Sequence, residues 1–92
     1  MPLAEQFDVA LAKVLQVVKA GGAAAEHVTR MTIYVTDLDA YRASRTALSP
    51  VWRRHMNRHY PAMTLVQVSG LVDAGAVVEI QADAVVPPRN AR

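Results

Sequence analysis

The sequence contains no cysteine, so disulfide bonds, thiolate metal ligands and cysteine nucleophiles are all excluded. It has no uncharged apolar run close to the ~18 residues of a membrane span, and its first residues lack the basic start and apolar core of a signal peptide. The formal net charge is only +2, which favours neither nucleic acid nor a membrane surface as a partner. These absences predict a cytoplasmic protein.

Apolar residues are present in excess. They make up 52% of the 92 residues, a length that has room for one domain. A chain of this size buries only roughly 60 to 70% of the surface that its unfolded form exposes. One small core therefore cannot hold all of them, and we expect some of the apolar residues to lie in interfaces between subunits.

The apolar residues follow a helical period and then strand patterns. Between positions 3 and 18 they recur every three or four residues, which predicts a helix, and Gly21-Gly22 can take the left-handed conformation that ends it. Three later segments, 28–36, 63–69 and 77–86, are rich in strand-forming residues and bounded by turn or loop residues. We expect a strand in each of them.

A second helical pattern lies between the first two of these strands. Asp37 is a good N-cap for it, and Tyr60-Pro61 should end it, because the residue before a proline is pushed towards extended geometry. Pro50 has no N–H to donate to a continuous helix. We therefore expect a kink or break near Leu48.

The order helix, strand, helix, strand, strand predicts an α+β domain of two layers, in which the helices cover one face of the sheet. We expect this single domain over residues 1–86 and a flexible tail over 87–92. The alternation of side chains along the strands puts Tyr34, Glu79 and Gln81 on the opposite face. Since the chain offers no third layer, a neighbouring subunit is the expected cover for that face.

Glu79 is a carboxylate between Val78 and Ile80 in the most strand-like segment of the chain. It is expected to point to the interface between subunits, where a carboxylate can serve as a general acid or base. The alternative is an ion pair across the interface with an arginine of another subunit. The residues alone do not decide between these two roles.

The one dense charge cluster is Arg53-Arg54-His55 with Arg58-His59. It could bind phosphate, but cations also gather at the C-terminal end of a helix, and no aromatic residues are interleaved for base stacking. We therefore expect a solvated helix face. The two histidines have no third ligand at a telling spacing, so no metal site is expected. No glycine-rich phosphate loop is present, and we expect no cofactor.

Three segments together carry a resemblance to a known family. They are Met31 to Leu38, MTIYVTDL; Tyr60 to Val68, YPAMTLVQV; and Val78 to Val85, VEIQADAV. In order and spacing they resemble the Rid family, also called YjgF or L-PSP endoribonuclease-like. The corresponding family strings are of the form T-V-Y-V-T-D-L, F-P-A-R-S/T-x-V-x-V and V-E-I-E-A-I-A-V. The resemblance extends over about residues 3–86.

The resemblance implies a chorismate-mutase-like α+β fold, a homotrimer around a central barrel, and small-molecule clefts between adjacent subunits. The best-understood members hydrolyse reactive enamines and imines to 2-oxo acids and ammonia. In that chemistry an arginine grips the substrate carboxylate, and the glutamate of the V-E-I-E motif positions water for attack. Glu79 matches that glutamate, so the resemblance implies a catalytic role for it.

Four further residues are expected in the substrate cleft. Met63 stands where the P-A-R string of the family has its arginine, and Leu65 stands where cysteine is common. Arg45 lies near the position of a cleft-facing asparagine and could replace the missing guanidinium. Tyr34 shares the sheet face of Glu79. The strand-rich N-terminal region of the family is not matched, and its absence would leave a sheet edge exposed.

These departures leave two functions open. The first is a Rid-like enamine/imine deaminase, with Glu79 as acid and base. The second is a non-catalytic module that binds a small metabolite or a partner protein in the trimer clefts. A third, the older association of the family with RNA cleavage, fits only the basic cluster and predicts RNA binding that depends steeply on salt.

Overall fold

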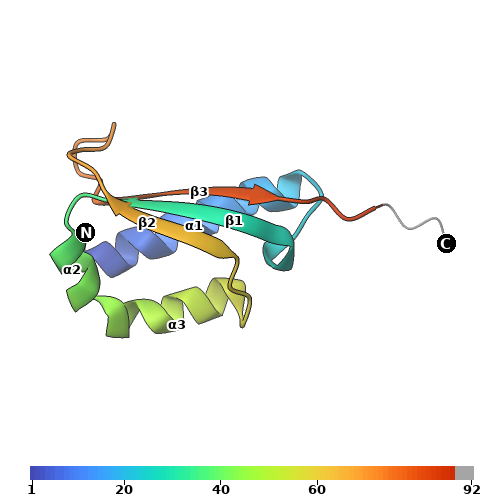
Figure 1. Ribbon diagram of the computed structural model, residues 1–92, viewed down its shortest axis with the longest axis horizontal. Helices are drawn as coiled ribbons and strands as arrows, with labels where there is room; N and C mark the ends of the chain where they lie inside the picture. The colour runs from blue at the N-terminus through green and yellow to red at the C-terminus, as the bar shows by residue number, and fades with distance from the viewer. Residues whose placement is uncertain (89–92) are drawn as a thin grey trace.

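In the computed structural model, which describes residues 1–88, three strands form one sheet in the order β2-β1-β3 (Figure 1). The central strand is β1, Val28–Val35. It pairs in parallel with β2, Ala62–Gln67, and antiparallel with β3, Val78–Ala84. The predicted strands are therefore present, each slightly shorter than expected. Both outer strands are edges of the sheet within the described residues.

Two long helices lie on one side of this sheet (Figure 1). They are α1, Leu3–Ala20, and α3, Arg45–Met56, while the short α2, Leu38–Ala43, leads into α3. A short 3-10 helix at Ala25–His27 precedes β1. The core joins the helices to alternate strand residues and consists of Phe7, Leu11, Val28, Met31, Ile33, Val35, Leu48, Val51, Trp52, Met56, Val78 and Ile80. The prediction of a two-layer α+β fold is confirmed.

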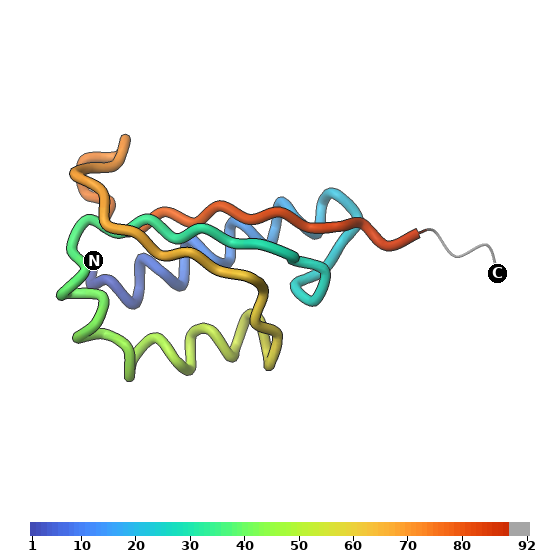
Figure 2. The backbone as a smooth tube through the Cα atoms, in the orientation of Figure 1, coloured from blue at the N-terminus to red at the C-terminus, as the bar shows by residue number. Residues whose placement is uncertain are grey.

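The first helix ends as its glycines predict. Gly21 keeps a helical conformation, and Gly22 takes a φ of +95°, a left-handed value that side chains other than glycine rarely adopt. The chain then turns, and β1 runs back in the direction opposite to that of α1 (Figure 2). None of the helices within residues 1–88 is long and apolar enough to cross a membrane.

The second helical region differs from the prediction at its break. Asp37 is the N-cap, its Oδ1 accepting a hydrogen bond from the Ala40 N–H at 3.0 Å, but the break lies at Ser44 rather than near Leu48. The Ser44 hydroxyl donates to the Ala40 carbonyl at 2.8 Å, a contact four residues back that bends helices.

Pro50 lies inside α3 without breaking it. The missing N–H leaves only the Thr46 carbonyl without its helical partner, and both residues are exposed to water. The helix also ends earlier than Tyr60-Pro61 predicts. It stops at Met56, because Asn57 has a φ of 56° and turns the chain away.

The expected tail over 87–92 is only partly described. Residues 87 and 88 belong to no helix or strand, and residues 89–92 lie outside the described residues.

The basic cluster near the end of α3 makes mainly structural contacts. Arg54 binds Asp8 of α1 at 2.7 Å, and the His55 ring lies 2.5 Å from the same carboxylate. His59 instead binds the Val28 carbonyl at 2.7 Å, so the two histidines have different partners. No group of three or more potential metal ligands occurs among the described residues.

The contact of Asp8 with α3 lowers the pKa of its carboxyl group. The hydrogen bond from His55, and then that from Arg54, holds the pKa of Asp8 below its usual value of 3.8. A lowered pKa in the folded state means that the ionised carboxylate stabilises the fold. That stabilisation is fully present above the usual value and is lost as the pH falls through the lowered one.

We expect Asp8→Asn to lower the thermal unfolding midpoint at pH 7, because the neutral amide cannot hold both α3 side chains. The difference in unfolding midpoint from the unchanged protein should narrow as the pH falls below 3.8, and it should vanish once the pH has passed through the lowered pKa, where the native carboxylate is itself protonated. Asp39→Asn is the matched control, since Asp39 pairs with Arg42 of its own helix and is 92% exposed. A difference in unfolding midpoint between Asp8→Asn and the unchanged protein that stays constant from pH 7 to pH 2 would contradict this explanation.

Candidate functional site

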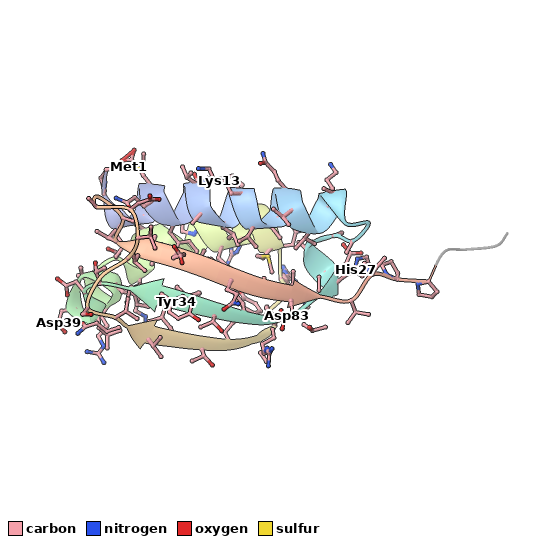
Figure 3. All side chains as sticks on the ribbon, turned by 90° about the horizontal axis from the view of Figure 1, so that it is seen from above. Met1, Lys13, His27, Tyr34, Asp39 and Asp83 are labelled. Atoms are coloured by element: carbon pink, nitrogen blue, oxygen red, sulfur yellow. The ribbon has the colours of Figure 1, made fainter. Side chains whose placement is uncertain are left out.

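The sheet face away from the helices carries Glu79, Tyr34 and Gln81, as the alternation of the strands predicts. Tyr34 and Glu79 are direct partners across β1 and β3. The Tyr34 hydroxyl donates to Gln81 Oε1 at 3.1 Å. Figure 3 looks down on the sheet from the side away from α3 and shows β3 between β1 and α1. The Glu79 side chain is exposed on this face and forms no hydrogen bond or ion pair with another described residue.

Glu79 borders two open pockets. One, of about 600 Å³, lies on the open face between Tyr34 and the loop that joins β2 to β3. That loop, orange in Figure 2, rises above the sheet on the side away from α3. Gly70, Leu71 and Val72 of the loop line this pocket. A ligand on the open face could therefore contact Glu79 and apolar loop residues together.

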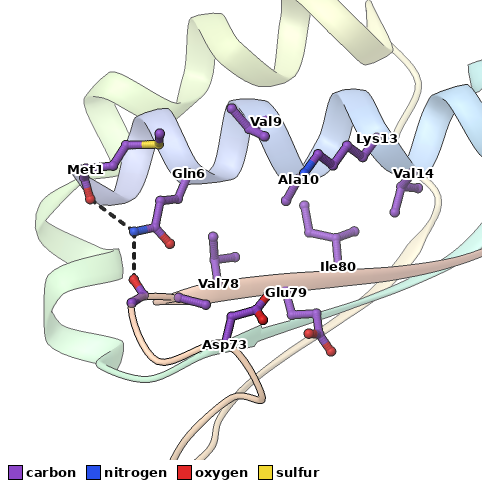
Figure 4. Close-up of a pocket in the computed structure, with 12 residues that line it drawn as sticks. Met1, Gln6, Val9, Ala10, Lys13, Val14, Asp73, Val78, Glu79 and Ile80 are labelled. Atoms are coloured by element: carbon purple, nitrogen blue, oxygen red, sulfur yellow. Dashed lines mark hydrogen bonds between the residues drawn. The ribbon is translucent and has the colours of Figure 1, made fainter.

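The second pocket, of about 480 Å³, lies between α1 and β3 (Figure 4). Val9 and Ala10 of α1 supply apolar wall, and Lys13 stands on the same helix. In Figure 4, Val78 and Ile80 point towards α1, and Glu79 points away from it. The carboxylate thus lies at the boundary of the pockets, on the edge strand of the sheet.

Gln6 holds the start of β3 against α1. Its side-chain NH₂ donates to the Gly75 carbonyl at 3.0 Å and to the Met1 carbonyl at 3.1 Å (Figure 4). Its side-chain carbonyl accepts from the Val77 N–H at 2.8 Å. Val77 is two residues before Glu79, so these bonds position the segment that carries the carboxylate. In the sequence Gln6 belongs to the amphipathic first helix, which resembles the first helix of the family, but periodicity does not reveal this role.

The other expected site residues lie on the helix side of the sheet. Met63 and Leu65 are in register with the buried Met31 and Ile33, so their side chains share the face that the helices cover. Leu65 is partly buried against the core. The structure thus brings Glu79 and Tyr34 together on one face and separates them from Met63 and Leu65.

Met63 and Arg45 meet at a smaller pocket of about 190 Å³ beside β2, which we call the edge pocket. Its remaining lining residues are Phe7, Ile33, Tyr41, Leu48, Ser49, Trp52 and Tyr60. Trp52 stacks on Tyr60 with ring centroids 5.9 Å apart, and its indole N–H donates to the His59 carbonyl at 3.2 Å. Trp52 and Tyr60 are not among the site residues expected from the sequence. The only signal of this pair in the sequence is an aromatic residue on each side of a helix end.

Comparison with known proteins identifies relatives of the chain. Residues 2–86 match the family model described as Endoribonuclease L-PSP. No curated protein gives a significant match. The chain is also similar to many solved structures.

A member of the YjgF/YER057c/UK114 family from Mycobacterium tuberculosis is 32% identical, with a TM-score of 0.73 over 86% of this chain and 64% of that one. TdcF of E. coli, solved with bound serine, is 27% identical, with a TM-score of 0.79 over 92% and 65%. The YjgF gene product of E. coli is 28% identical, with a TM-score of 0.70 over 83% and 58%. The chain therefore spans less than two thirds of each relative, and the expected YjgF-type fold is confirmed.

We expect Gln6→Ala to loosen the start of β3. Loss of the bond to Val77 should cost about 1 kcal/mol locally, so the Val77 amide should exchange its hydrogen roughly fivefold faster. Gln16→Ala is the matched control, because Gln16 is an exposed glutamine of the same helix. Equal exchange rates at Val77 in the two variants would show that Gln6 does not hold this segment.

Proposed function

Because the chain belongs to the Endoribonuclease L-PSP family, also called YjgF or Rid, we propose that it hydrolyses small reactive imines and enamines to carbonyl products and ammonia. The position of Glu79 carries the proposal. It is the glutamate of the segment that resembles the V-E-I-E motif, and it lies exposed between two pockets. An unpartnered carboxylate beside a pocket is free to exchange protons with a bound water.

In the proposed reaction, Glu79 is the only residue that takes up and releases protons. The carboxylate takes a proton from a water molecule as the water oxygen bonds to the imine carbon, and it passes this proton to the imine nitrogen. In the resulting carbinolamine, the carboxylate takes the proton of the hydroxyl group and passes it to the amino nitrogen. The carbon–nitrogen bond then breaks, the carbonyl group forms, ammonia leaves, and Glu79 is again ionised. The products are a carbonyl compound and ammonia, and no cofactor is required for this sequence.

A homotrimer is part of the proposal. In one protomer, Glu79 lies on β3 and the open face, whereas Met63 and Arg45 lie beyond β1 on the helix side. A cleft that used both groups would need residues from two copies. Exposed apolar side chains on the sheet support such contacts, among them Val66 at 38% and Met63 at 44% exposed.

A second candidate function is binding without catalysis. It is favoured by Met63, because a thioether cannot form the charge-assisted pair that an arginine makes with a carboxylate. TdcF, a relative, was solved with serine bound, which supports recognition of a small molecule by this fold. On this alternative the chain binds a small metabolite or a partner protein in the clefts between subunits.

The deaminase proposal predicts that the protein accelerates release of 2-oxo acid when an amino-acid dehydratase supplies the imine. We expect Glu79→Gln to reduce this acceleration roughly a hundredfold or more, the usual contribution of a general acid or base. Asp83→Asn is the matched control, since Asp83 is an acidic residue of the same strand and face that pairs with Arg30. No acceleration by the native protein with several dehydratase substrates would exclude the proposed activity.

Met63→Arg separates the two candidates. If the native protein is a binding module, this change should create deaminase activity that the native protein lacks, because it supplies a guanidinium for the substrate carboxylate. Met63→Gln is the control for polarity without charge. A native protein already as active as Met63→Arg would count against the binding-only function.

A further inference from the structure

The edge pocket has the size and walls of a site for one apolar group. Phe7 and Ile33 are each 3% exposed and form its floor, and the exposed Met63 and Tyr60 stand at its opening. Its volume of about 190 Å³ is slightly larger than the ~150 Å³ cavity of aliphatic and aromatic residues that accepts benzene in another protein. A single aromatic ring or a branched aliphatic chain would fill it.

Three side chains that can donate hydrogen bonds line the edge pocket from α2 and α3. Tyr41, Arg45 and Ser49 follow each other at spacings of four residues, and all three line the pocket. Their side chains form no hydrogen bond or ion pair with any described residue. Arg30, Arg42 and Arg54 are by contrast each paired with an aspartate.

The charge of the edge pocket has one sign. None of its lining residues is acidic, and Arg45 is the only one that carries a full charge. A guanidinium prefers a planar anion that accepts two parallel hydrogen bonds, and a carboxylate meets that requirement. The hydroxyl groups of Tyr41 and Ser49 on either side can donate further bonds.

We propose that the edge pocket binds a small monocarboxylate with an aromatic or branched aliphatic body. The body occupies the space between Trp52, Tyr60 and Met63, and the carboxylate binds Arg45 at the rim. As a statement about substrates, this inference rests on the proposed function and narrows it to 2-imino and 2-oxo acids with such side chains. As a statement about binding, it stands on the contacts of the edge pocket alone.

Met63 has a specific part in this assignment. An arginine at its position would place a second cation at the opening of the pocket, whereas the thioether adds apolar surface and adapts its shape to a ring. The carboxylate of the ligand is therefore held from the helix side, by Arg45, and its apolar body contacts the strand side, at Met63.

Trp52 makes the inference directly measurable. It is the single tryptophan of the chain, and it lines the edge pocket, so its fluorescence reports whether the pocket is occupied. The probe is 3-phenylpropionate. We expect a saturable change, with roughly tenfold or more weaker binding of propionate, which lacks the ring, and of 3-phenylpropanamide, which lacks the charge.

Two arginine variants complete the test. Arg45→Gln should weaken binding of 3-phenylpropionate roughly tenfold or more and leave binding of the amide nearly unchanged. Arg53→Gln should bind like the native protein, because Arg53 is an exposed arginine of the same helix outside the edge pocket. Calorimetry of the same titrations measures binding independently of the fluorescence.

The outcomes separate this inference from the proposed function. Binding of 3-phenylpropionate that requires Arg45, without any hydrolysis of imines, supports the inference and excludes the deaminase. Hydrolysis of small imines with no heat and no fluorescence change on addition of 3-phenylpropionate overturns the inference and leaves the deaminase standing. Equal loss of binding in Arg45→Gln and Arg53→Gln would also overturn it.

Discussion

A sheet covered by helices on one side only is the constraint on which the rest of the structure depends. In the central strand, Met31, Ile33 and Val35 are 1%, 3% and 0% exposed, because they face α1 and α3 across the core. Successive side chains of a strand point to opposite faces, so Tyr34 must lie on the uncovered face. Its partner Glu79 lies there for the same reason. Burial of the core therefore determines which face presents the carboxylate.

Each long helix also forms one wall of a pocket at an edge of the sheet. Beside β3, α1 walls the pocket next to Glu79, and Gln6 fastens the incoming loop to that helix. Beside β2, α3 supplies Arg45 and Trp52 to the edge pocket. Within one protomer, β1 therefore separates Glu79, which is suited to proton transfer, from the edge pocket, which is suited to an apolar body. The proposed trimer is the arrangement that would bring them together.

The first helix and the strands were predicted correctly from the sequence, whereas the points at which the second helical region breaks and ends were not. Periodicity predicted α1, because burial of one helix face imposes a regular spacing over many residues. The strands were predicted from strand-forming residues between turns, and only β1 and β3 show alternating burial, since nearly all of β2 is exposed. The break at Ser44 and the helix end at Asn57 were missed. Prolines indicate where a helix is unfavourable, but in this chain the helices end before the prolines can end them. The Ser44 hydroxyl bonds the Ala40 carbonyl where α2 ends, and Asn57 takes a positive φ where α3 ends. Of the candidate site, the shared face of Glu79 and Tyr34 was predictable.

The sequence by itself determined the α+β class, the one-sided sheet and the family, since these depend on periodicity and on three motifs in order. Only the tertiary structure decided that Met63 and Arg45 line one pocket with the stacked Trp52 and Tyr60. The period of a strand assigns each residue to a face. Which helix residues meet that face depends on how the helices pack over it, and contacts between segments far apart in the chain determine that packing.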